Sequence, residues 1–331
     1  MTPQHPSKPI RPPPTAHLRL ATSPILPLPV PMQTIDQLTG RFSITDEVGF
    51  EELTPGYPVV RIRNAHAKAS ITLQGAHLTD YCLNDEPPII FTSNAAVFQK
   101  GIAIRGGIPV CWPWFNAHPS DSSQPAHGYA RINLWNLEKT ESTREGTRLV
   151  FSLPPQDDSN LATMLEFHVG KDLQLALHTI NIGKSKETFS EALHSYFAVT
   201  DSRQTLVHGL DGEHYINTVG VESTQQQQGP VTFPDEIDRI YQSDRHTIIE
   251  DLVTHRQIRV AKSGSNSTIV WNPGQKKGTS MKDLPDNEIH HFVCVESANV
   301  RNQSITLAPG ENHILHLRIS TESLDVTPSN K

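Results

Sequence analysis

The sequence predicts an all-β fold, a large antiparallel β-sandwich or barrel, for residues 36–319. Three observations support this prediction. Many short runs alternate apolar and polar residues, glycine-containing turns separate them, and no amphipathic helix of three turns is visible. Alternation places one side of a strand in a core, and many short strands without helical spacers favour antiparallel sheets over an α/β fold.

The clearest predicted element is a hairpin. Residues 165–169 alternate apolar and polar side chains, residues 170–172 (Gly-Lys-Asp) provide a turn, and residues 173–180 alternate back. The polar run at residues 225–228, four glutamines, is expected to be a surface loop. Further short strands are expected at residues 59–63, 148–151, 268–271, 292–295 and 313–319.

The two ends of the chain differ in composition from the predicted domain. Ten of the 26 prolines fall within the first 31 residues, and proline can neither donate to a β-ladder nor continue a helix. We therefore expect residues 1–35 to be a disordered Pro-rich extension and residues 320–331 to be a frayed tail. The first segment is neither Ser-rich nor amphipathic, which favours a dispensable tail, or a start at Met32, over an organellar targeting segment.

Composition excludes several functional classes. With 28 Lys+Arg against 35 Asp+Glu and a formal net charge of −7, the chain has no basic field for nucleic acid or an anionic membrane. No stretch reaches about 18 apolar residues, the length that a membrane-spanning helix needs. Three scattered cysteines are too few for a disulfide framework or a cysteine-based zinc site. We expect a soluble, cytoplasmic monomer.

Several standard catalytic and metal-binding motifs are missing from the sequence. There is no Gly-rich phosphate loop, no H-E-x-x-H, no EF-hand loop and no G-x-S-x-G. The 17 histidines do not converge on a metal geometry; His313 and His316, for example, would point to opposite faces of a strand. No metal site is therefore expected.

Two loop-like segments, residues 104–115 and 125–131, concentrate side chains that could hold a ligand. Aromatic faces stack on sugar rings, and the planar fork of arginine binds carboxylate or phosphate through two hydrogen bonds. The candidates are Arg105, Trp112, Trp114, His127 and Arg131.

Two further segments contain isolated titratable residues in apolar surroundings. His194 lies inside the apolar run 192–199. Alternation along residues 292–296 places Glu296 on the same face as Phe292 and Cys294. A carboxylate in such a strand needs either a partner or a chemical task, because burying an unpaired charge is costly.

These segments together resemble the glucose-6-phosphate 1-epimerases (D-hexose-6-phosphate mutarotases) of the aldose 1-epimerase superfamily. The resemblance covers about residues 36–319 in collinear order, and its longest motif is the most specific. The motifs are R-G-G-I-P-V-C-W-P-W-F at 105–115, H-G-Y-A-R at 127–131, L-H-S-Y-F at 193–197, T-F-P-D at 232–235, D-R-I-Y at 238–241, W-N-P-G at 271–274 and C-V-E at 294–296.

The resemblance implies a galactose-mutarotase-like β-supersandwich, a hexose 6-phosphate substrate, no metal and no organic cofactor. The catalytic histidine and glutamate of the family fall on His194 and Glu296. Its sugar- and phosphate-binding positions fall on Arg105, Arg131 and Asp238. The residue before the H-G-x-A-R motif is a polar contact in some members and is Ala126 here.

The chemistry of anomer interconversion agrees with this pair. Ring opening removes the proton from O1 and protonates the ring oxygen, the open aldehyde rotates about C1–C2, and the ring closes on its other face. We expect Glu296 to act as base and His194 as acid, with the roles exchanged during closure, each transfer contributing roughly 10²–10⁴-fold. Trp112 or Trp114, His127 and the arginines would hold the sugar.

Structural roles compete with each of these assignments. A histidine in an apolar run is commonly a packing residue, and a glutamate at a strand end is commonly solvated or salt-bridged. The Trp112-Pro-Trp114 segment could be a packing corner, both arginines could form structural ion pairs, and His127 could only position Arg131. The adjacent Asp238 and Arg239 could be a simple surface pair.

Three other functions also remain open at this stage. An aldose 1-epimerase for unphosphorylated sugar would have the same acid and base. A non-catalytic sugar-binding or regulatory protein could have the same fold, because fold does not determine function. A glycoside hydrolase would need two carboxylates roughly 5–9.5 Å apart, and the sequence offers one good candidate.

Overall fold

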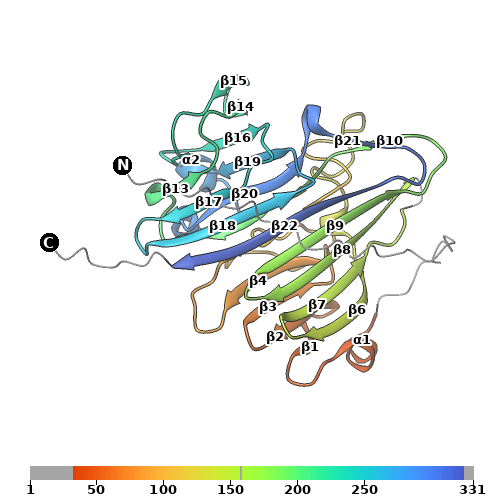
Figure 1. Cartoon of the computed structure of the whole chain (residues 1–331). Coiled ribbons are helices and arrows are strands. Elements are labelled where there is room, and N and C mark those ends of the chain that lie inside the picture. Colours follow the sequence, from red (N-terminus) through yellow and green to blue (C-terminus); the bar gives the residue numbers. More distant parts are fainter. Residues whose placement is uncertain (1–32, 157–158, 324–331) are drawn as a thin grey trace, which may run out of the picture.

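The alternating runs form antiparallel strands arranged in three large sheets and one two-stranded ribbon (Figure 1). The structure, a computed structural model, describes residues 33–156 and 159–323. Within these residues every paired strand is antiparallel. The predicted all-β, antiparallel class is confirmed.

The first of two eight-stranded sheets contains the predicted hairpin as β8 and β9. Buried and half-buried residues alternate along both strands, so one face of the sheet meets the core and the other meets solvent. In spatial order the strands are β13 (Thr205–His208), β17 (Thr247–Asp251), β18 (Arg256–Ser263), β22 (Asn312–Ser323), β9 (Leu173–Asn181), β8 (Leu161–Gly170), β7 (Gly146–Ser152) and β6 (Asn136–Thr143).

The second eight-stranded sheet contains parts of three segments with candidate site residues, 104–115, 192–199 and 292–296. Its order is β15-β14-β16-β19-β20-β11-β5, with β12 also paired to β20. Strands β19 and β20 are buried on both faces. The bounds are β15 (Ser223–Gln226), β14 (His214–Asn217), β16 (Ile237–Tyr241), β19 (Ser267–Asn272), β20 (Phe292–Asn299), β11 (Glu191–Leu193), β5 (Val110–Cys111) and β12 (Tyr196–Ala198).

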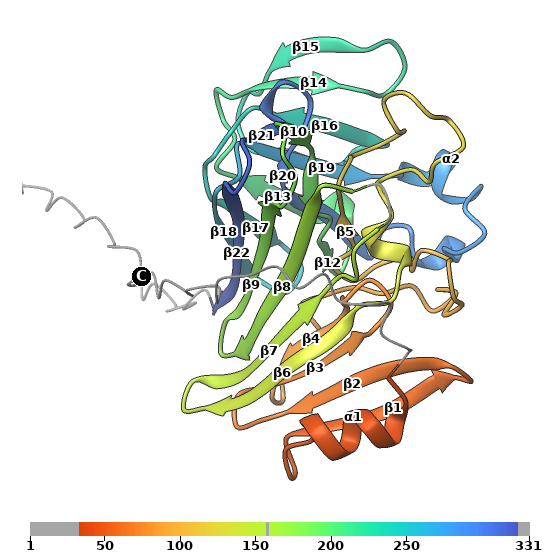
Figure 2. The same cartoon turned by 90° about the vertical axis from the view of Figure 1, so that its right-hand side faces the viewer.

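The third sheet is a four-stranded meander near the N-terminus, with a short helix packed beside it (Figure 2). Helix α1 (Ile35–Phe42) begins with a capping box formed by Thr34 and Gln37, and it buries Leu38 and Phe42. The strands are β1 (Val48–Thr54), β2 (Tyr57–Arg63), β3 (Ala67–Thr72) and β4 (His77–Leu83).

The remaining elements are short connections. The two-stranded ribbon pairs β10 with β21, and α2 follows β19. Their bounds, with those of the four 3₁₀ turns, are β10 (Glu187–Phe189), β21 (Ile305–Leu307), α2 (Gly274–Gly278), η1 (Ala130–Ile132), η2 (Ser202–Gln204), η3 (Asp286–Glu288) and η4 (Arg301–Gln303).

One continuous hydrophobic core joins the three large sheets. Phe167 of the first sheet, Val295 of the second and Ile71 of the meander belong to the same cluster, and none is more than 1% exposed. Burying one such side chain contributes roughly 1.5–3 kcal/mol. Two smaller apolar clusters lie on the other face of the second sheet, one around Cys111 and Ile269 and one around Tyr196 and Trp271.

The structure extends the predicted domain slightly at both ends. Helix α1 begins at Ile35, one residue before the expected start, and β22 continues to Ser323, four residues beyond the expected end at residue 319. Most of the expected N-terminal extension (residues 1–32) and tail (residues 324–331) lies outside the described residues. No helix in the described part of the chain has the length and apolar composition of a membrane span.

The expectation of a surface loop at the four glutamines is wrong. Residues 225 and 226 belong to edge strand β15, and Gln227 is buried. The side-chain oxygen of Gln227 accepts hydrogen bonds from Arg239 and Tyr241, at 3.0 and 2.7 Å, which connects the end of β15 to β16. A buried amide that is fully hydrogen-bonded is compatible with this position.

Candidate functional site

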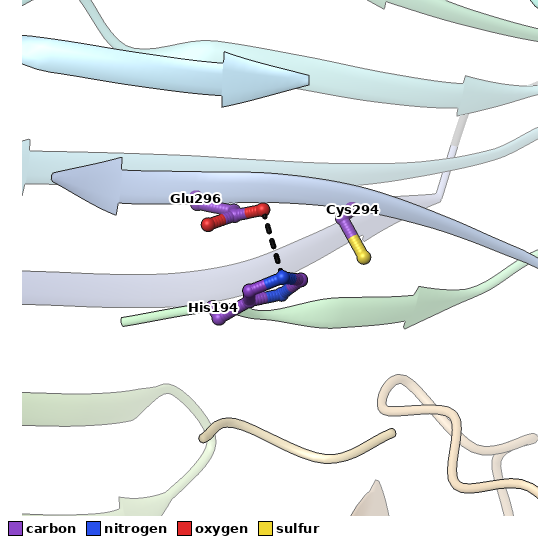
Figure 3. Close-up of side chains that lie close together, drawn as sticks. All are labelled: His194, Cys294 and Glu296. Carbon is purple, nitrogen blue, oxygen red and sulfur yellow. Dashed lines mark ion pairs between the residues drawn. The ribbon is translucent and has the colours of Figure 1, made fainter. Parts of the chain in front are cut away.

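The register of the second sheet brings His194 and Glu296 together. Strands β11 and β12 pair with β20 in one uninterrupted register, since Leu193 lies opposite Ser297 and Tyr196 lies opposite Cys294. His194, between β11 and β12, therefore lies directly opposite Glu296. Figure 3 shows their side chains facing each other, and His194 Nε2 lies 3.3 Å from Glu296 Oε1.

A break in the strand accompanies this pair. Residues 192–199 were expected to be one strand-like run, but His194 and Ser195 separate β11 from β12. The His194 N–H donates to Pro109 O at 3.0 Å, and the Ser195 N–H donates to Leu193 O at 2.9 Å. The His194 bond continues the register between β5 and β11, whereas the Ser195 N–H turns back within its own segment, although the Ser195 carbonyl still accepts from the Val295 N–H at 3.3 Å.

Burial controls the protonation of the pair. The Glu296 side chain is 1% exposed, and burial, reinforced by Asp238, raises its pKa well above the usual value, although Arg131 opposes the shift. Burial lowers the pKa of His194 well below its usual value, and the cations Arg131 and Arg105 add to this effect. Both shifts favour the uncharged form of the group, so they favour a proton on the carboxyl over a proton on the imidazole. A single shared proton equips the pair for acid–base chemistry.

Three buried polar atoms at the site have no hydrogen-bond partner among the described residues. They are His194 Nδ1, Glu296 Oε2 and Arg131 Nε. Leaving a buried polar atom unsatisfied costs roughly 1–3 kcal/mol, so such atoms are rare in structural roles and frequent where a ligand binds.

Arg105 is connected to the pair through an aromatic ring. Its Nη1 donates to the Tyr196 hydroxyl at 2.9 Å, and its Nε donates to Asp283 Oδ2 at 3.2 Å. The Tyr196 ring stacks on the His194 imidazole with centroids 4.9 Å apart and planes 13° apart. Arg105 is thus held beside the pair, with part of its charge balanced by Asp283.

Glycine is required two residues after Arg105. Gly107 has φ +69°, and a Cβ there would lie 2.3 Å from His77 Nε2 and 2.4 Å from Leu78 O. The His77 ring nitrogen Nε2 also lies 2.8 Å from Gly106 O. This close packing fixes the backbone that carries Arg105.

His127 and Arg131 come from the loop that follows β5. The His127 ring lies 6.0 Å from the His194 ring, and burial lowers the pKa of His127 to about 3, so its imidazole is neutral. Arg131 Nη2 donates to the backbone oxygen of Ala126 at 2.8 Å. Ala126, which has no polar side chain, therefore contributes its carbonyl to Arg131.

The structure does not bring Trp112 to the site. Trp112 is 1% exposed within the main core, and its indole N–H donates to Thr179 Oγ1 at 3.1 Å. Trp114 is half-buried and donates to Pro125 O at 2.9 Å. Its ring packs edge-on against Tyr129 and His118, so it braces the loop. Trp112 therefore packs in the core, whereas contact of the half-buried Trp114 with a sugar stays a prediction.

A second aromatic ring beside the pair, after that of Tyr196, belongs to Trp271. Its centroid lies 6.0 Å from the His194 ring, and β19 places Trp271 opposite both Cys294 and Asp238. Asp238 is thereby on the same face of the sheet as the pair, and burial raises its pKa. Only the W-N-P-G motif marked Trp271 in the sequence, because an aromatic residue in a buried strand is ordinarily a core residue.

Cys294 was also not foreseen as part of the site. It lies two residues before Glu296 on β20, and Figure 3 shows both side chains on the face that His194 occupies. One potential metal-ligand atom from each of His194, Cys294 and Glu296 lies within 4.8 Å of the other two. The three residue types are common zinc ligands.

A separate groove of about 380 Å³ lies away from the pair, between the turn before β1 and the β6–β7 turn. Both signs of charge line it, from Asp46 and Glu47 and from Arg63 and Arg144. None of the candidate site residues borders this groove.

Sequence comparison gives a family match across most of the chain. Residues 58–320 match the family model of aldose 1-epimerase. A protein of Escherichia coli K12 named "Putative glucose-6-phosphate 1-epimerase" is 35% identical over 248 residues, which cover 72% of this chain and 82% of that protein. A protein of the same name from Cenchrus ciliaris is 31% identical over 283 residues, 79% of this chain and 85% of that protein.

Solved structures give the same answer for the fold. A crystal structure described as "a putative mutarotase" from Salmonella typhimurium has a TM-score of 0.79 and 29% identity, covering 86% of this chain and 96% of that chain. A galactose mutarotase-like protein from Lactobacillus casei, with 14% identity and a TM-score of 0.64, covers 80% of this chain and 100% of that chain. The predicted mutarotase-like β-supersandwich is confirmed.

Proposed function

The chain belongs to the aldose 1-epimerase family, and we propose that it interconverts the α and β anomers of D-glucose 6-phosphate. The observation that supports this most directly is the buried His194–Glu296 pair, an acid and a base 3.3 Å apart, each with one further polar atom that has no hydrogen-bond partner among the described residues. The names of the similar proteins from Escherichia coli and Cenchrus ciliaris support the phosphorylated substrate.

The pair can move the two protons that the reaction requires. In the tautomer with the proton on His194, Glu296 takes the O1 proton while the imidazolium protonates the ring oxygen, which opens the pyranose. Rotation about C1–C2 turns the aldehyde, and the reverse transfers close the ring with O1 on the other face. The two residues exchange the roles of acid and base in the second half of the reaction, so the pair regains its starting protonation.

Neighbouring side chains supply the hydrogen bonds that hold a sugar. His127 is a neutral imidazole and can donate or accept, and Asp238 can accept from hydroxyl groups. The Tyr196 hydroxyl accepts from Arg105, which leaves its own proton free to donate. Trp271 offers an apolar surface beside His194.

The phosphate would bind chiefly to Arg131. A hexose 6-phosphate brings close to two negative charges to a chain of net charge −7, so attraction must come from local cations. Arg105 shares its charge with Asp283, 3.2 Å away. Among the described residues no carboxylate pairs with Arg131, and its Nε is unpartnered. Arg131 therefore has the larger unused capacity for a phosphate.

Anomer exchange measured by NMR tests the substrate. The exchange rates of glucose 6-phosphate, glucose and galactose are compared at equal concentration with the purified protein. We expect the highest kcat/KM for glucose 6-phosphate. Equal or faster exchange of glucose or galactose would favour the second candidate, an epimerase of unphosphorylated aldoses, which the family match also supports. No acceleration of any sugar would favour a non-catalytic sugar-binding role.

A further inference from the structure

We propose that His194, Cys294 and Glu296 form an inhibitory binding site for a divalent cation of borderline softness, such as Zn²⁺. The cation would be an inhibitor and not a cofactor, because it would occupy the two atoms that the proposed reaction uses. The competition with sugar rests on the proposed function, whereas the binding of the cation does not.

The positions of the three side chains suit one tetrahedral ion. Zinc bonds of about 2.0–2.1 Å to nitrogen and 2.0–2.2 Å to oxygen place two ligand atoms about 3.4 Å apart at the tetrahedral angle. His194 Nε2 and Glu296 Oε1 are 3.3 Å apart. One potential ligand atom from each of the three residues lies within 4.8 Å of the other two. Sulfur lies about 3.6 Å from the nitrogen and oxygen ligands of a zinc complex, so a side-chain shift of about 1 Å completes the set.

The burial of the site also points to a ligand. Glu296 is 2% exposed, and its second carboxylate oxygen has no partner among the described residues. Cys294 is fully buried and within reach of the same position. Three protein ligands would leave one position of a tetrahedral ion open, as in zinc sites that keep an exchangeable ligand.

Charge and protons balance in the complex. The ion forms bonds to sulfur, nitrogen and oxygen, and the Cys294 thiol proton and the proton shared by His194 and Glu296 pass to solvent. A thiolate and a carboxylate then neutralise the divalent charge. Nearby Arg105 and Arg131 oppose a cation, so the site should be weaker than a structural zinc site.

Occupation by the ion would exclude the sugar. The His194 nitrogen and the Glu296 oxygen would be coordinated and unable to exchange protons with O1 and the ring oxygen. Zn²⁺ should therefore raise the apparent KM for glucose 6-phosphate, with kcat unchanged at saturating sugar, and a chelator should restore activity.

The test combines a spectroscopic probe with matched cysteine variants. Co²⁺ replaces Zn²⁺ as the probe, because a thiolate bound to Co²⁺ gives a charge-transfer absorption band. The band is recorded for the unmodified protein, for Cys294→Ala and for Cys111→Ala. Cys111 is an equally buried control on β5 of the same sheet, outside the cluster. Zn²⁺ inhibition of anomer exchange is measured on the same three proteins with free Zn²⁺ buffered.

We expect the band in the unmodified protein and in Cys111→Ala, its loss in Cys294→Ala, and its displacement by glucose 6-phosphate. Loss of a residue that only hydrogen-bonds to a metal ligand weakens metal binding about 10–100-fold. Loss of a ligand itself should weaken binding at least as much. The Zn²⁺ concentration for half inhibition, measured relative to each variant's own exchange rate without Zn²⁺, should therefore rise at least 10-fold in Cys294→Ala.

Inhibition of Cys294→Ala at the original Zn²⁺ concentration, or a Co²⁺ complex without a thiolate band, would overturn the proposal. If Cys294→Ala does not fold, as judged by circular dichroism, Cys294→Ser takes its place. Even without a variant, the presence or absence of the thiolate band in the unmodified protein decides whether a cysteine binds the metal. A thiolate band in a protein that exchanges no sugar would contradict the proposed function alone. Exchange without the band would contradict the metal site alone.

Discussion

At the scale of single residues, the buried carboxylate of Glu296 on the adjacent strand distinguishes His194 from a packing histidine. His208 and Glu250 also lie 2.7 Å apart on adjacent strands, but their side chains are 39% and 21% exposed. The His194 and Glu296 side chains are 11% and 1% exposed. Burial shifts the pKa of His194 and of Glu296 toward the uncharged form of each group.

Replacing either member of the buried pair should abolish most anomer exchange. Glu296→Gln keeps the shape but cannot accept the O1 proton, and His194→Ala removes the acid, so each should lower kcat by about 10²–10⁴-fold. The control is Glu250→Gln, which breaks the exposed His–Glu pair on the other large sheet. Exchange by NMR within a few-fold of the unmodified rate in Glu296→Gln would remove Glu296 from the mechanism.

The pH dependence of kcat/KM should be bell-shaped. The histidine should set the acid limb and the glutamate the alkaline limb, which is the reverse of the order of their ordinary pKa values. The active form holds one proton, so activity falls when a second proton binds at low pH and when the last one leaves at high pH. Because burial lowers the pKa of His194 and raises that of Glu296, the acid limb should belong to the imidazole and the alkaline limb to the carboxyl.

Profiles recorded at two temperatures check this assignment. Imidazole ionisation has a much larger enthalpy than carboxyl ionisation, so the acid limb should move with temperature and the alkaline limb should hardly move. A temperature-sensitive alkaline limb would contradict the reversed order.

Arg131→Ala should discriminate between sugars with and without phosphate. A charge-assisted bond to phosphate contributes about 1.5–3 kcal/mol, so kcat/KM for glucose 6-phosphate should fall about 10–150-fold while residual exchange of glucose stays nearly constant. Arg131→Lys should restore only part of the loss, because an ammonium lacks the planar fork. Arg148→Ala, at a salt bridge with Glu166 on the first large sheet, is the control. Equal losses on both sugars would assign Arg131 to the ring or the fold.

At the scale of elements, alternation identified strands but not their interruptions. The hairpin of β8 and β9 was predictable because its two strands are local and each has one solvated face. The break between β11 and β12 was not, because the Ser195 N–H bonds to Leu193 O within an apolar run that alternation alone describes as continuous. The glutamine run and Trp112 misled for a related reason, since polar and aromatic composition does not reveal which hydrogen-bond partners a distant strand supplies.

The segment that carries Arg105 gives a prediction at this scale. Gly107→Ala should destabilise the fold and reduce activity, because the methyl group would meet His77 and Leu78, and the Gly107 carbonyl accepts the Tyr196 N–H at 3.0 Å. Left-handed backbone strain costs roughly 1–2 kcal/mol, and overpacking adds about 1–3 kcal/mol.

Gly101→Ala is the matched control for Gly107→Ala. It imposes the same backbone strain, at φ +80°, but nothing lies within 4 Å of its added methyl group. Denaturant unfolding and kcat/KM are compared for both variants. Equal effects of the two substitutions would show that the close approach at Gly107 has no importance.

At the scale of the whole molecule, the site is assembled from segments that sequence order keeps far apart. Arg105 and Asp283 are 178 residues apart, and their ion pair, like the position of Asp238 beside β20, exists only after the second sheet has formed. Family motifs could therefore mark Arg105 and Asp238 as ligand contacts. They could not show that Asp283 balances part of the Arg105 charge.

Two truncations test where the folded unit begins. Removing residues 1–31 is expected to leave the melting temperature and activity unchanged, as the composition of that segment predicts. Removing residues 1–43 should lower the melting temperature, because Leu38 and Phe42, buried by α1, contribute roughly 1.5–3 kcal/mol each. Thermal unfolding followed by circular dichroism measures both. A large loss in the shorter truncation would show that residues 1–31 contribute to the fold.

The uninterrupted register between β20 and the β11–β12 pair has a consequence for how relatives of this protein can diverge. Loop substitutions around Arg131 or His127 can change which sugar is held without altering the separation of His194 and Glu296, because backbone pairing sets that separation. Inserting or deleting a single residue within β20 would instead move its side chains to the opposite face. Divergence in substrate range should therefore accumulate as changes in loop length and composition, while the lengths of these strands stay constant.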